Sequence, residues 1–331
     1  VKPMDNIQHI GIVGVGRMSK AIAIAFAYAG IPVQLIDAKE RPVNDFALYE
    51  QQAMQDIKQE LQLLVSTGFL LQAAVDEVLA RIGVLSKTQA PVFLQQCDLI
   101  MEGVSEVQAA KQEMFAWLDQ HIPAQCIVAS TTSTFLVSEI AAMLSHPERV
   151  INAHWLNPAY LIPLVELSKS SVTAAQVVQD LQQFLESIGK VTVVCNESAG
   201  YIVPRIQALA MNEAARMVEE GVATAAEIDK AIRTGFGLRF SVLGMLEFID
   251  WGGGDILYYA SQYLQQELGE RYRPPQIIQS NMDKKHNGMR EGKGFYDYAQ
   301  VDVNAYKLQV MSTFVNRIDG VGLKPKFNVL H

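Results

Sequence analysis

The sequence predicts an α/β domain with a parallel sheet covered by helices, followed by an all-α domain. Short apolar runs of β type alternate with stretches of helical periodicity up to residue 194, and alternation of this kind is typical of parallel sheets. After the polar turn at residues 196–200 every remaining segment is predicted to be helix or loop. The length of 331 residues accommodates two domains, which we place at residues 1–196 and 197–331.

The first domain contains six predicted strands. They are Ile7–Val13, Val33–Asp37, Leu99–Glu102, Ile127–Ser130, Val150–Ala153 and Val191–Val194. Arg17–Ala29 and Val107–Leu118 are expected to be crossover helices, because each places apolar side chains on one helical face. Residues 44–80 hold two helical patterns that break near residues 66–68, which indicates a helical excursion from the sheet.

The second domain is predicted to be a helical bundle that serves substrate binding and dimerisation. Its helical candidates are Ile202–Glu220, Ala225–Thr234, Val242–Phe248 and Ile256–Leu268, and the prolines at 274 and 275 end the last run. The alanines and methionines of Ala208–Met217 favour close helix packing and a subunit interface. We therefore expect a homodimer.

Composition and charge exclude several classes of partner. The chain has 27 Lys and Arg against 35 Asp and Glu, and its net charge of −8 disfavours attraction to nucleic acid or to an anionic membrane. No apolar stretch reaches the roughly 20 residues of a membrane-spanning helix, and the first residues lack a secretory signal. Cys97, Cys126 and Cys195 lack metal-ligand spacing. We expect a soluble cytoplasmic protein that has reduced thiols and no metal and acts on a small molecule.

Residues 10–19, Ile-Gly-Ile-Val-Gly-Val-Gly-Arg-Met-Ser, place two glycines between the first strand and a helix. Gly14 permits a tight turn, and Gly16 lets the backbone approach a pyrophosphate. The helix N-terminus that follows, with Arg17 and Met18, offers unpaired N–H groups and a partial positive charge. The segment therefore predicts a Rossmann-type dinucleotide site, in which all four of these residues bind the cofactor.

Two further residues bear on this cofactor. Ser19 occupies the third glycine of the GxGxxG motif and is small enough for close helix packing. Asp37 ends the second strand about 20 residues after the glycines, where a carboxylate accepts hydrogen bonds from the adenosine ribose. Asp37 favours NAD over NADP, although the nearby Arg41 leaves a double specificity open. The alternative is that the glycines form only a tight turn and that Asp37 caps a helix.

His154 lies just beyond the β-run Val150–Ala153, and open sheets build their sites at strand ends. Oxidation of a secondary alcohol requires a base for the hydroxyl proton, and a neutral imidazole titrates in the useful range. A carboxylate on the other ring nitrogen would fix the tautomer and stabilise the imidazolium, and Glu166 is the candidate. The intervening loop, with Pro158 and Pro163, is consistent with one strand returning beside another. Spacing alone does not show the pair.

Several motifs resemble those of the 3-hydroxyacyl-CoA dehydrogenase superfamily, and the resemblance extends over nearly the whole chain. The family carries His-x-x-Asn-Pro followed by Leu-Val-Glu, and this sequence has His154–Pro158 and Leu164–Glu166. Three further segments are similar to family motifs: Ala129–Thr134 to Ala-Ser-Asn-Thr-Ser-Ser, Glu102–Glu106 with Lys111 to Val-Glu-Ala-x-x-Glu and its following lysine, and Gly292–Tyr296 to Gly-x-Gly-Phe-Tyr.

The resemblance implies a catalytic dyad in which His154 is the base and Glu166 orients it. The other residues to which it gives a role are Ser133 at the substrate oxygen, Asn157 beside the nicotinamide and substrate, and Glu106 and Lys111 in binding NAD. The implied function is NAD-dependent oxidation of a short-chain (S)-3-hydroxyacyl-CoA, such as 3-hydroxybutyryl-CoA, to the 3-ketoacyl-CoA.

Other segments depart from the family pattern. Pro204 replaces the asparagine of Gly-Phe-Ile-Val-Asn-Arg and cannot donate the hydrogen bond that helps hold the substrate. Either another group replaces it or the substrate sits differently. Ile162–Glu166 and Gly237–Phe240 are similar to λ-crystallin and L-gulonate 3-dehydrogenase, relatives that act on free hydroxy acids. Arg239, expected on the second-domain side of the substrate site, could pair with a free carboxylate or form a surface ion pair.

Two alternatives therefore stay open. One is an NAD-dependent dehydrogenase of a free 3-hydroxy acid, L-gulonate-like or carnitine-like. Residues 44–80 contain only Lys58 to meet the phosphates of CoA, which proteins usually bind with Lys or Arg. The other alternative is a non-catalytic structural protein that retains NAD binding, and the intact dyad argues against it.

Overall fold

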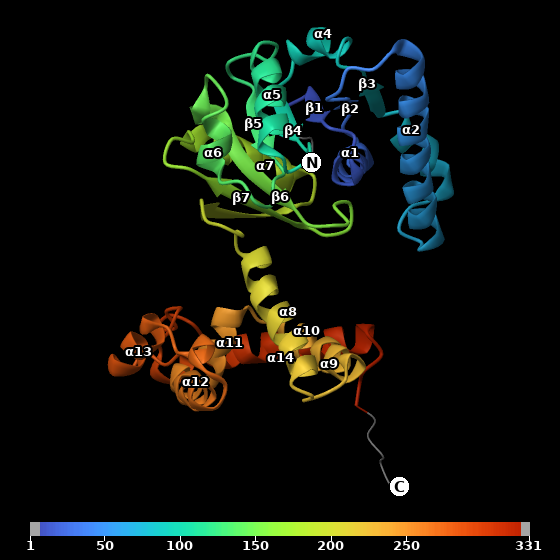
Figure 1. Cartoon of the computed structure of the whole chain (residues 1–331). Coiled ribbons are helices and arrows are strands. Elements are labelled where there is room, and N and C mark those ends of the chain that lie inside the picture. The colour runs from blue at the N-terminus through green and yellow to red at the C-terminus, as the bar shows by residue number, and fades with distance from the viewer. Residues whose placement is uncertain (1–6, 326–331) are drawn as a thin grey trace. The chain divides into compact units, whose positions relative to one another are not determined.

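The computed structural model describes residues 7–325 and divides the chain into two compact units, Val1–Leu209 and Ala210–His331 (Figure 1). The first unit is α/β and the second contains helices joined by loops, which confirms the predicted fold class. The predicted boundary at residue 197 directly follows the last strand, β8 (Val191–Asn196). Helix α8 (Val203–Glu219) runs across the division between the two units.

The first unit is built on an eight-stranded sheet of order β3-β2-β1-β4-β5-β6-β7-β8. The other seven strands are β1 (Ile10–Val13), β2 (Val33–Ile36), β3 (Ile82–Leu85), β4 (Leu99–Glu102), β5 (Ile127–Ser130), β6 (Val150–Trp155) and β7 (Leu164–Lys169). From β1 the sheet grows towards β3 on one side and towards β8 on the other. In such doubly wound sheets, ligands bind beyond the C-terminal ends of the strands where the order reverses.

The sheet is parallel, as predicted, except at one place, where β6 and β7 are antiparallel. Residues 156–163, which join them, are too few for the crossover of a dozen or more residues that a parallel connection needs. The chain therefore turns back directly. The six predicted strands omitted β7 and also β3, whose four residues include Gly83 and provide too short an apolar run to stand out.

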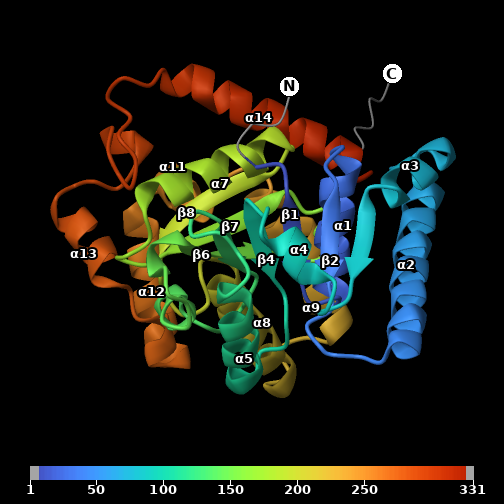
Figure 2. The ribbon, with the colours of Figure 1, turned by 90° about the horizontal axis from the view of Figure 1, so that it is seen from above.

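Helices cover both faces of this sheet (Figure 2). They are α1 (Arg17–Tyr28), α2 (Val43–Ser66), α3 (Val75–Leu79), α4 (Ala90–Leu94), α5 (Gln108–Asp119), α6 (Val137–Ala141) and α7 (Ala175–Ser187), with 3-10 turns at Gln72–Ala74 and Pro147–Arg149. Helices α2 and α3 form the predicted excursion, and α2 ends at Ser66, where the sequence pattern breaks. Successive residues of the central strands belong to two different buried clusters, one on each face.

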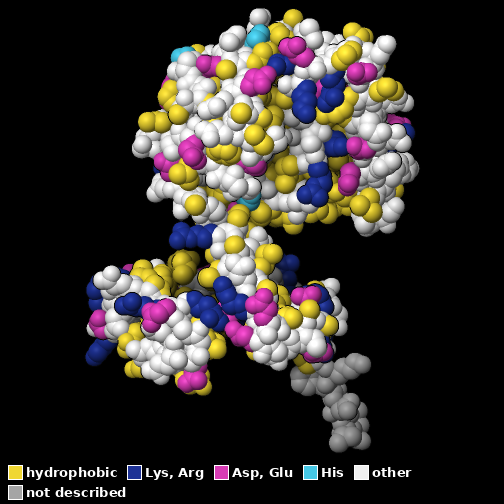
Figure 3. Space-filling model, viewed as in Figure 1, with side chains coloured by type: hydrophobic (Ala, Val, Ile, Leu, Met, Phe, Trp, Pro, Cys, Tyr) yellow, Lys and Arg dark blue, Asp and Glu magenta, His cyan; other side chains and the backbone are white. Residues whose placement is uncertain are grey.

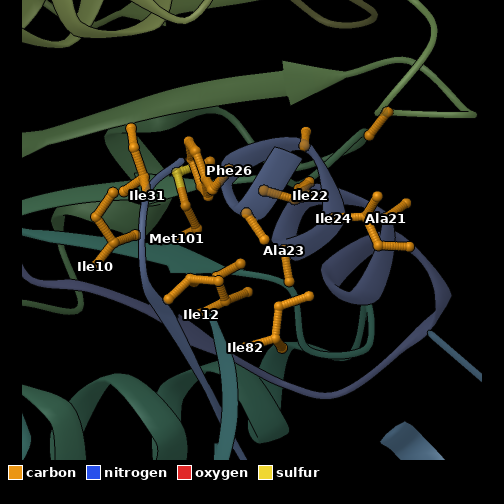
Figure 4. Close-up of a cluster of buried hydrophobic side chains, with 14 of the residues drawn as sticks. Ile10, Ile12, Ala21, Ile22, Ala23, Ile24, Phe26, Ile31, Ile82 and Met101 are labelled. Carbon is orange, nitrogen blue, oxygen red and sulfur yellow. The ribbon is translucent and has the colours of Figure 1, made fainter. Parts of the chain in front are cut away.

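Helix α1 is the most deeply packed of these helices, because its sequence is apolar over most of its surface. Figure 4 shows Ile22, Ala23 and Phe26 of α1 beside Ile10 and Ile12 of β1, and all five side chains are completely buried. Burying a side chain such as Ile or Phe stabilises a fold by roughly 1.5–3 kcal/mol. This packing fixes the turn between β1 and α1, where the cofactor site is predicted.

The second unit contains α9 (Ala225–Ala231), α10 (Gly237–Phe240), α11 (Met245–Gly252), α12 (Gly254–Leu268), α13 (Gln276–Asp283) and α14 (Val303–Gly320), with a π-helical turn at Ile232–Phe236 and 3-10 turns at Glu270–Tyr272 and Met289–Glu291. Figure 3 shows apolar side chains among charged ones on its visible face. The sequence did not predict α13 and α14. None of the helices within residues 7–325 is long and apolar enough to cross a membrane.

The Gly-x-Gly-Phe-Tyr segment of the second unit is anchored by Asp250, a buried carboxylate on α11. The backbone N–H groups of Phe295 and Tyr296 each donate to it at 2.9 Å, and the hydroxyl of Tyr298 donates at 3.1 Å. A Cβ atom at Gly294 would lie 2.1 Å from Asp250 Oδ1, so the close approach requires glycine. This motif therefore closes a loop of the second unit.

Candidate active site

The two glycines of the turn between β1 and α1 differ. The backbone of the turn requires glycine at position 14, whereas the space beside Gly16 is unfilled. Gly14 has a φ of +98°, and a Cβ atom there would lie 2.7 Å from the carbonyl oxygen of Gly103. A Cβ atom at Gly16 would meet only that same oxygen, at 4.0 Å. The protein's own packing thus demands Gly14 but not Gly16. The open space at Gly16, at the N-terminus of α1, fits the approach of a phosphate group.

Ser19 packs where the third glycine of the motif would lie, and Gly103 makes room for it. Ser19 is buried, and a Cβ atom at Gly103 would lie 2.4 Å from Ser19 Oγ. The helix therefore stays close to the strand ends because the small residue has moved from α1 to the segment after β4. Serine in place of the third glycine therefore does not push α1 away from the strands.

A cavity of about 620 Å³ adjoins this turn. Its lining includes Gly14, Gly16, Asp37 and Arg41, which follow the ends of β1 and β2. Asp37 is buried; it accepts hydrogen bonds from the backbone N–H of Lys39 at 3.1 Å and from Nε of Arg41 at 2.5 Å. Size, glycine lining and a carboxylate at the end of the second strand together fit a dinucleotide.

The sequence reasoning did not find Tyr49, which also lines this cavity. The guanidinium carbon of Arg41 lies 4.0 Å from the centroid of its ring. Arg41 is thus held by Asp37 on one side and by the Tyr49 ring on the other. Because its charge is paired with Asp37, it is not free to attract the 2′-phosphate that distinguishes NADP.

The side chains of Arg17 and Met18, predicted to bind the cofactor, do not line the cavity that contains Asp37. Arg17 lines a second cavity of about 410 Å³, together with Lys20, Asn157 and other residues from α1, α2 and the loop after β6. Met18 is half-buried and packs against the main hydrophobic cluster. The structure therefore places Arg17 beside the predicted substrate residue Asn157, in a different cavity from Asp37.

Glu106 and Lys111 belong to a polar network between β4 and β5. Lys111 Nζ is fully buried; it lies 2.8 Å from an oxygen of the buried Glu102 and 3.8 Å from Glu106 Oε2. The hydroxyls of Thr132 and Thr134 donate to Glu106 at 2.8 and 3.0 Å. Sequence reasoning missed the partner Glu102. Lys111 is fixed beneath the site by that carboxylate, and Glu106 shapes the segment that bears Ser133.

His154 and Glu166 are both buried and lie opposite each other on the neighbouring strands β6 and β7. They are directly opposed in this antiparallel pair, and directly opposed residues share one face of a sheet. His154 Nδ1 lies 2.9 Å from Glu166 Oε2. Twelve residues separate the two side chains in the sequence. The chain completes β6, forms one loop and returns along β7, which brings them together.

Glu166 is held as an anion by three hydrogen bonds. Its second oxygen, Oε1, accepts the backbone N–H groups of Ile202 at 3.0 Å and Val203 at 2.8 Å, at the start of α8. Burial opposes the charged form, but the hydrogen bonds from His154, Val203 and Ile202 outweigh it and lower the pKa of Glu166. An ionised carboxylate only accepts hydrogen bonds, so Nδ1 of His154 carries the proton and Nε2 is left with its lone pair.

Tyr201 is a site residue that the sequence marks only as a variant of the family's phenylalanine. Its ring stacks on that of His154, with centroids 4.8 Å apart and planes at 15°. Its hydroxyl donates to the carbonyl oxygen of Thr132 at 2.6 Å and accepts from Asn152 Nδ2 at 3.1 Å. Burial raises the pKa of Tyr201, which therefore stays neutral. The stacked ring limits rotation of the imidazole.

The remaining predicted residues lie in three places. Ser133 is exposed after β5, and its backbone N–H donates to Glu106 Oε1 at 3.2 Å. Pro204 is the second residue of α8, directly after the Val203 that caps Glu166. Arg239 lies in the second unit on α10, with its guanidinium carbon 4.7 Å from the ring centroid of Phe248. Within residues 7–325 no three His, Cys, Asp or Glu side chains are grouped to hold a metal ion.

Comparison with known proteins gives matches over both units. A family model described as the 3-hydroxyacyl-CoA dehydrogenase NAD binding domain matches residues 9–198, and one for the C-terminal domain of the same enzymes matches residues 200–298. A probable 3-hydroxybutyryl-CoA dehydrogenase of Bacillus subtilis is 31% identical over 296 residues, which cover 89% of this chain and 99% of that protein.

Two solved structures extend the comparison. A 3-hydroxyacyl-CoA dehydrogenase from Archaeoglobus fulgidus has a TM-score of 0.74 and 29% identity, with 95% of this chain and 99% of that chain covered. An NAD⁺-dependent dismutase, 5-formyl-3-hydroxy-2-methylpyridine 4-carboxylic acid 5-dehydrogenase, has a TM-score of 0.67 and 25% identity, with 96% and 100% covered.

Proposed function

The chain belongs to the 3-hydroxyacyl-CoA dehydrogenase family and is an NAD-dependent oxidoreductase, and we propose on this basis that it oxidises short-chain (S)-3-hydroxyacyl-CoA to the 3-ketoacyl-CoA. The relative named for 3-hydroxybutyryl-CoA supports a substrate of that size. The observation that carries the proposal is the buried pair of His154 Nδ1 and Glu166 Oε2 at 2.9 Å. This pair leaves one basic nitrogen for the substrate hydroxyl.

His154 is the general base of this mechanism. Its Nε2 accepts the proton of the C3 hydroxyl, while Glu166 keeps the proton on Nδ1 and the ring in place. NAD supplies the acceptor for the hydride that leaves the same carbon. In the reverse direction His154 returns the proton to the ketone oxygen. A positioned base of this kind contributes roughly 10²- to 10⁴-fold to a rate.

Other residues bind and orient the reactants. Gly14, Gly16 and Asp37 would hold NAD, Asp37 through the ribose hydroxyls. Ser133 would contact the substrate oxygen, and Asn157 would lie beside the nicotinamide and the substrate. Glu106 and Lys111 support the cofactor site through the network that joins β4 to the segment after β5. Arg17 serves the substrate side, because it shares a cavity with Asn157.

A second candidate substrate is a free 3-hydroxy acid. Helix α2 places the carboxylates of Asp56 and Glu60 at the cavity that contains Asn157, and residues 44–80 hold six acidic residues against the single cation of Lys58. The net negative charge of residues 44–80 is unfavourable for the phosphates of CoA, while Arg17 and Lys20 of α1 balance the two carboxylates within the cavity itself. The related dehydrogenase of a pyridine carboxylic acid also supports a substrate without CoA.

Rates measured side by side with acetoacetyl-CoA, 3-hydroxybutyryl-CoA and a panel of free 3-hydroxy acids test the proposal. We expect the CoA thioesters to give the higher kcat/KM. A higher kcat/KM for a free acid would establish the second candidate. Tight NADH binding without turnover on either panel would instead identify a non-catalytic protein that retains the cofactor fold.

We further propose that the protein is a cytoplasmic homodimer. Cys97, Cys126 and Cys195 are free thiols, and the first two are buried, which supports a reducing compartment such as the cytoplasm. The apolar side chains exposed on helices of the second unit, among them Leu308, Met311 and Val315, support the association of two copies.

A further inference from the structure

We propose that Lys190 is a positioning residue that holds the loop carrying Asn157, the β6–β7 loop formed by residues 156–163. The inference rests on the proposed function in one respect only, the role of Asn157 at the substrate. The anchoring itself depends on the contacts of Lys190, which lie entirely within the first unit.

Lys190 sits where the chain leaves α7 and enters β8, directly after Gly189, whose φ is +83°. Only 9% of the residue is exposed. Its ammonium donates to the carbonyl oxygen of Ala159 at 2.5 Å and to that of Ile162 at 3.0 Å. Nζ also lies 5.2 Å from the ring centroid of Trp155. One charged group thus contacts the last residue of β6 and two carbonyls of the loop that follows.

These contacts are unusual for a buried lysine. No carboxylate among residues 7–325 pairs with Lys190, and burial lowers its pKa. The ammonium has three donors, two of which the loop carbonyls use, and the indole face compensates for part of the lost hydration. An apolar residue of equal length would leave both loop carbonyls without this donor. A buried carbonyl group without a hydrogen bond destabilises a fold, because it has also lost its bond to water.

The loop that Lys190 anchors begins beside the proposed base and ends beside its partner. It starts after Trp155, the neighbour of His154, and ends before Leu164, two residues ahead of Glu166. Two other contacts fasten it: the N–H of Val191 donates to Pro163 at 2.9 Å, and the hydroxyl of Tyr160 donates to Glu60 at 2.6 Å.

The same loop forms one wall of the cavity of about 410 Å³, to which Asn157, Pro158 and Tyr160 contribute. A displaced loop would therefore move Asn157 and reshape this wall. The cavity that contains Asp37 has no residue from the loop. Loss of the ammonium should accordingly weaken catalysis on the hydroxy substrate while NADH binding is kept.

The test uses the full-length protein and the variants Lys190→Met, Lys190→Gln and Lys190→Arg, with Lys169→Met at the other end of β7 as the matched control. Three quantities are measured: kcat and KM for the hydroxy substrate, the Kd for NADH, and amide hydrogen exchange of a peptide covering residues 156–163. For Lys190→Met we expect kcat/KM to fall roughly 10- to 100-fold, as for misplacement of about 1 Å. We also expect faster exchange in the loop, a change in the NADH Kd much smaller than the change in kcat/KM, and substantial recovery in Lys190→Arg.

Outcomes separate the inference from the proposed function. Loop exchange equal to that of the wild type in Lys190→Met, or a loss of NADH binding and thermal stability equal to the loss in kcat/KM, would overturn the positioning role. If Lys190→Met does not fold, the comparison of Lys190→Gln with Lys190→Arg decides, since only arginine keeps a charged donor. A wild type without turnover on either substrate panel would reject the proposed function, and loop exchange would still test Lys190.

Discussion

At the scale of single residues, the site depends on where one proton resides. Glu166 accepts a hydrogen bond from His154 on one oxygen and two backbone N–H groups on the other, and the ring of Tyr201 stacks on the imidazole. The carboxylate is thereby fixed as an anion and the imidazole is fixed in orientation. A histidine on a buried strand could otherwise adopt either tautomer and more than one rotamer.

Replacing His154 with Gln should lower kcat by at least roughly 10²- to 10⁴-fold, because the variant lacks the base for the hydroxyl proton. Affinity for NADH should change little, since the cavity containing Asp37 does not include His154. Steady-state kinetics and fluorescence titration with NADH measure the two quantities. Retention of wild-type turnover would refute the assignment of the base.

The lowered pKa of Glu166 predicts a pH-dependent contribution to stability. A carboxyl group whose pKa is lower in the folded state stabilises the fold above its unfolded pKa, and this stabilisation disappears as the pH falls through the folded value. The free energy of unfolding of the wild type should exceed that of Glu166→Gln by roughly 1–3 kcal/mol at pH 6. The difference should shrink below about pH 4.

Chemical denaturation at several pH values measures this difference. Glu267→Gln, at an exposed carboxylate on α12, is the control and should change stability little. A difference that grows as the pH falls would mean that Glu166 is protonated in the folded protein.

At the scale of elements, strand ends and the turns after them place every proposed contact. Gly14, Asp37 and Gly103 directly follow β1, β2 and β4, which are adjacent in the sheet. His154 lies near the end of β6 and meets Glu166 because β7 is antiparallel. A parallel β7 would have required a crossover and would have separated these residues in sequence much further.

The two glycines of the β1–α1 turn should respond differently to alanine. Gly14→Ala forces a Cβ atom to within 2.7 Å of a backbone oxygen at a φ of +98°, and should cost at least roughly 1–3 kcal/mol of stability. Gly16→Ala meets no such obstacle in the protein itself. It should keep the melting temperature and weaken NADH binding, because the added methyl group occupies the approach of the phosphate.

Thermal unfolding with and without NADH distinguishes the two variants. Equal destabilisation of both without the cofactor would show that Gly16 is also required by the fold. Unchanged NADH affinity in Gly16→Ala would place the pyrophosphate away from this turn.

At the scale of the whole molecule, the chemistry of the proposed dyad is complete within the first unit. His154, Glu166, Tyr201 and the N-terminus of α8 all belong to residues 1–209. The second unit contributes helices with exposed apolar side chains, such as the stripe of Leu308, Met311 and Val315 on α14. Their spacing of three and four residues places them on one helical face, as in helices that pack against a partner.

This surface predicts self-association. Light scattering coupled to size-exclusion chromatography should give a mass twice the 36.6 kDa of the chain. Replacing Leu308, Met311 and Val315 together with Ser should shift the mass towards that of the monomer if α14 lies in the interface. A wild-type mass of one chain at micromolar concentration would contradict the proposed dimer.

The sequence by itself determined the fold class, and it predicted the cofactor turn and the two candidate residues of the dyad. Periodicity separates strands from helices because a strand alternates every second residue and a helix every 3.6, and glycines mark turns because other residues cannot adopt their backbone. The single antiparallel strand, the short edge strand β3 and the helices α13 and α14 were not predicted, because short or weakly periodic segments take their structure from their neighbours.

Only the tertiary structure decided which groups meet. It opposed His154 and Glu166 across two strands, moved Arg17 to the cavity of Asn157, and paired Lys111 with Glu102. It also brought Tyr201 and Lys190 to the site from segments about 36 to 47 residues further along the chain than His154. A sequence pattern records local backbone preference, whereas a contact between distant residues depends on the path of every element between them.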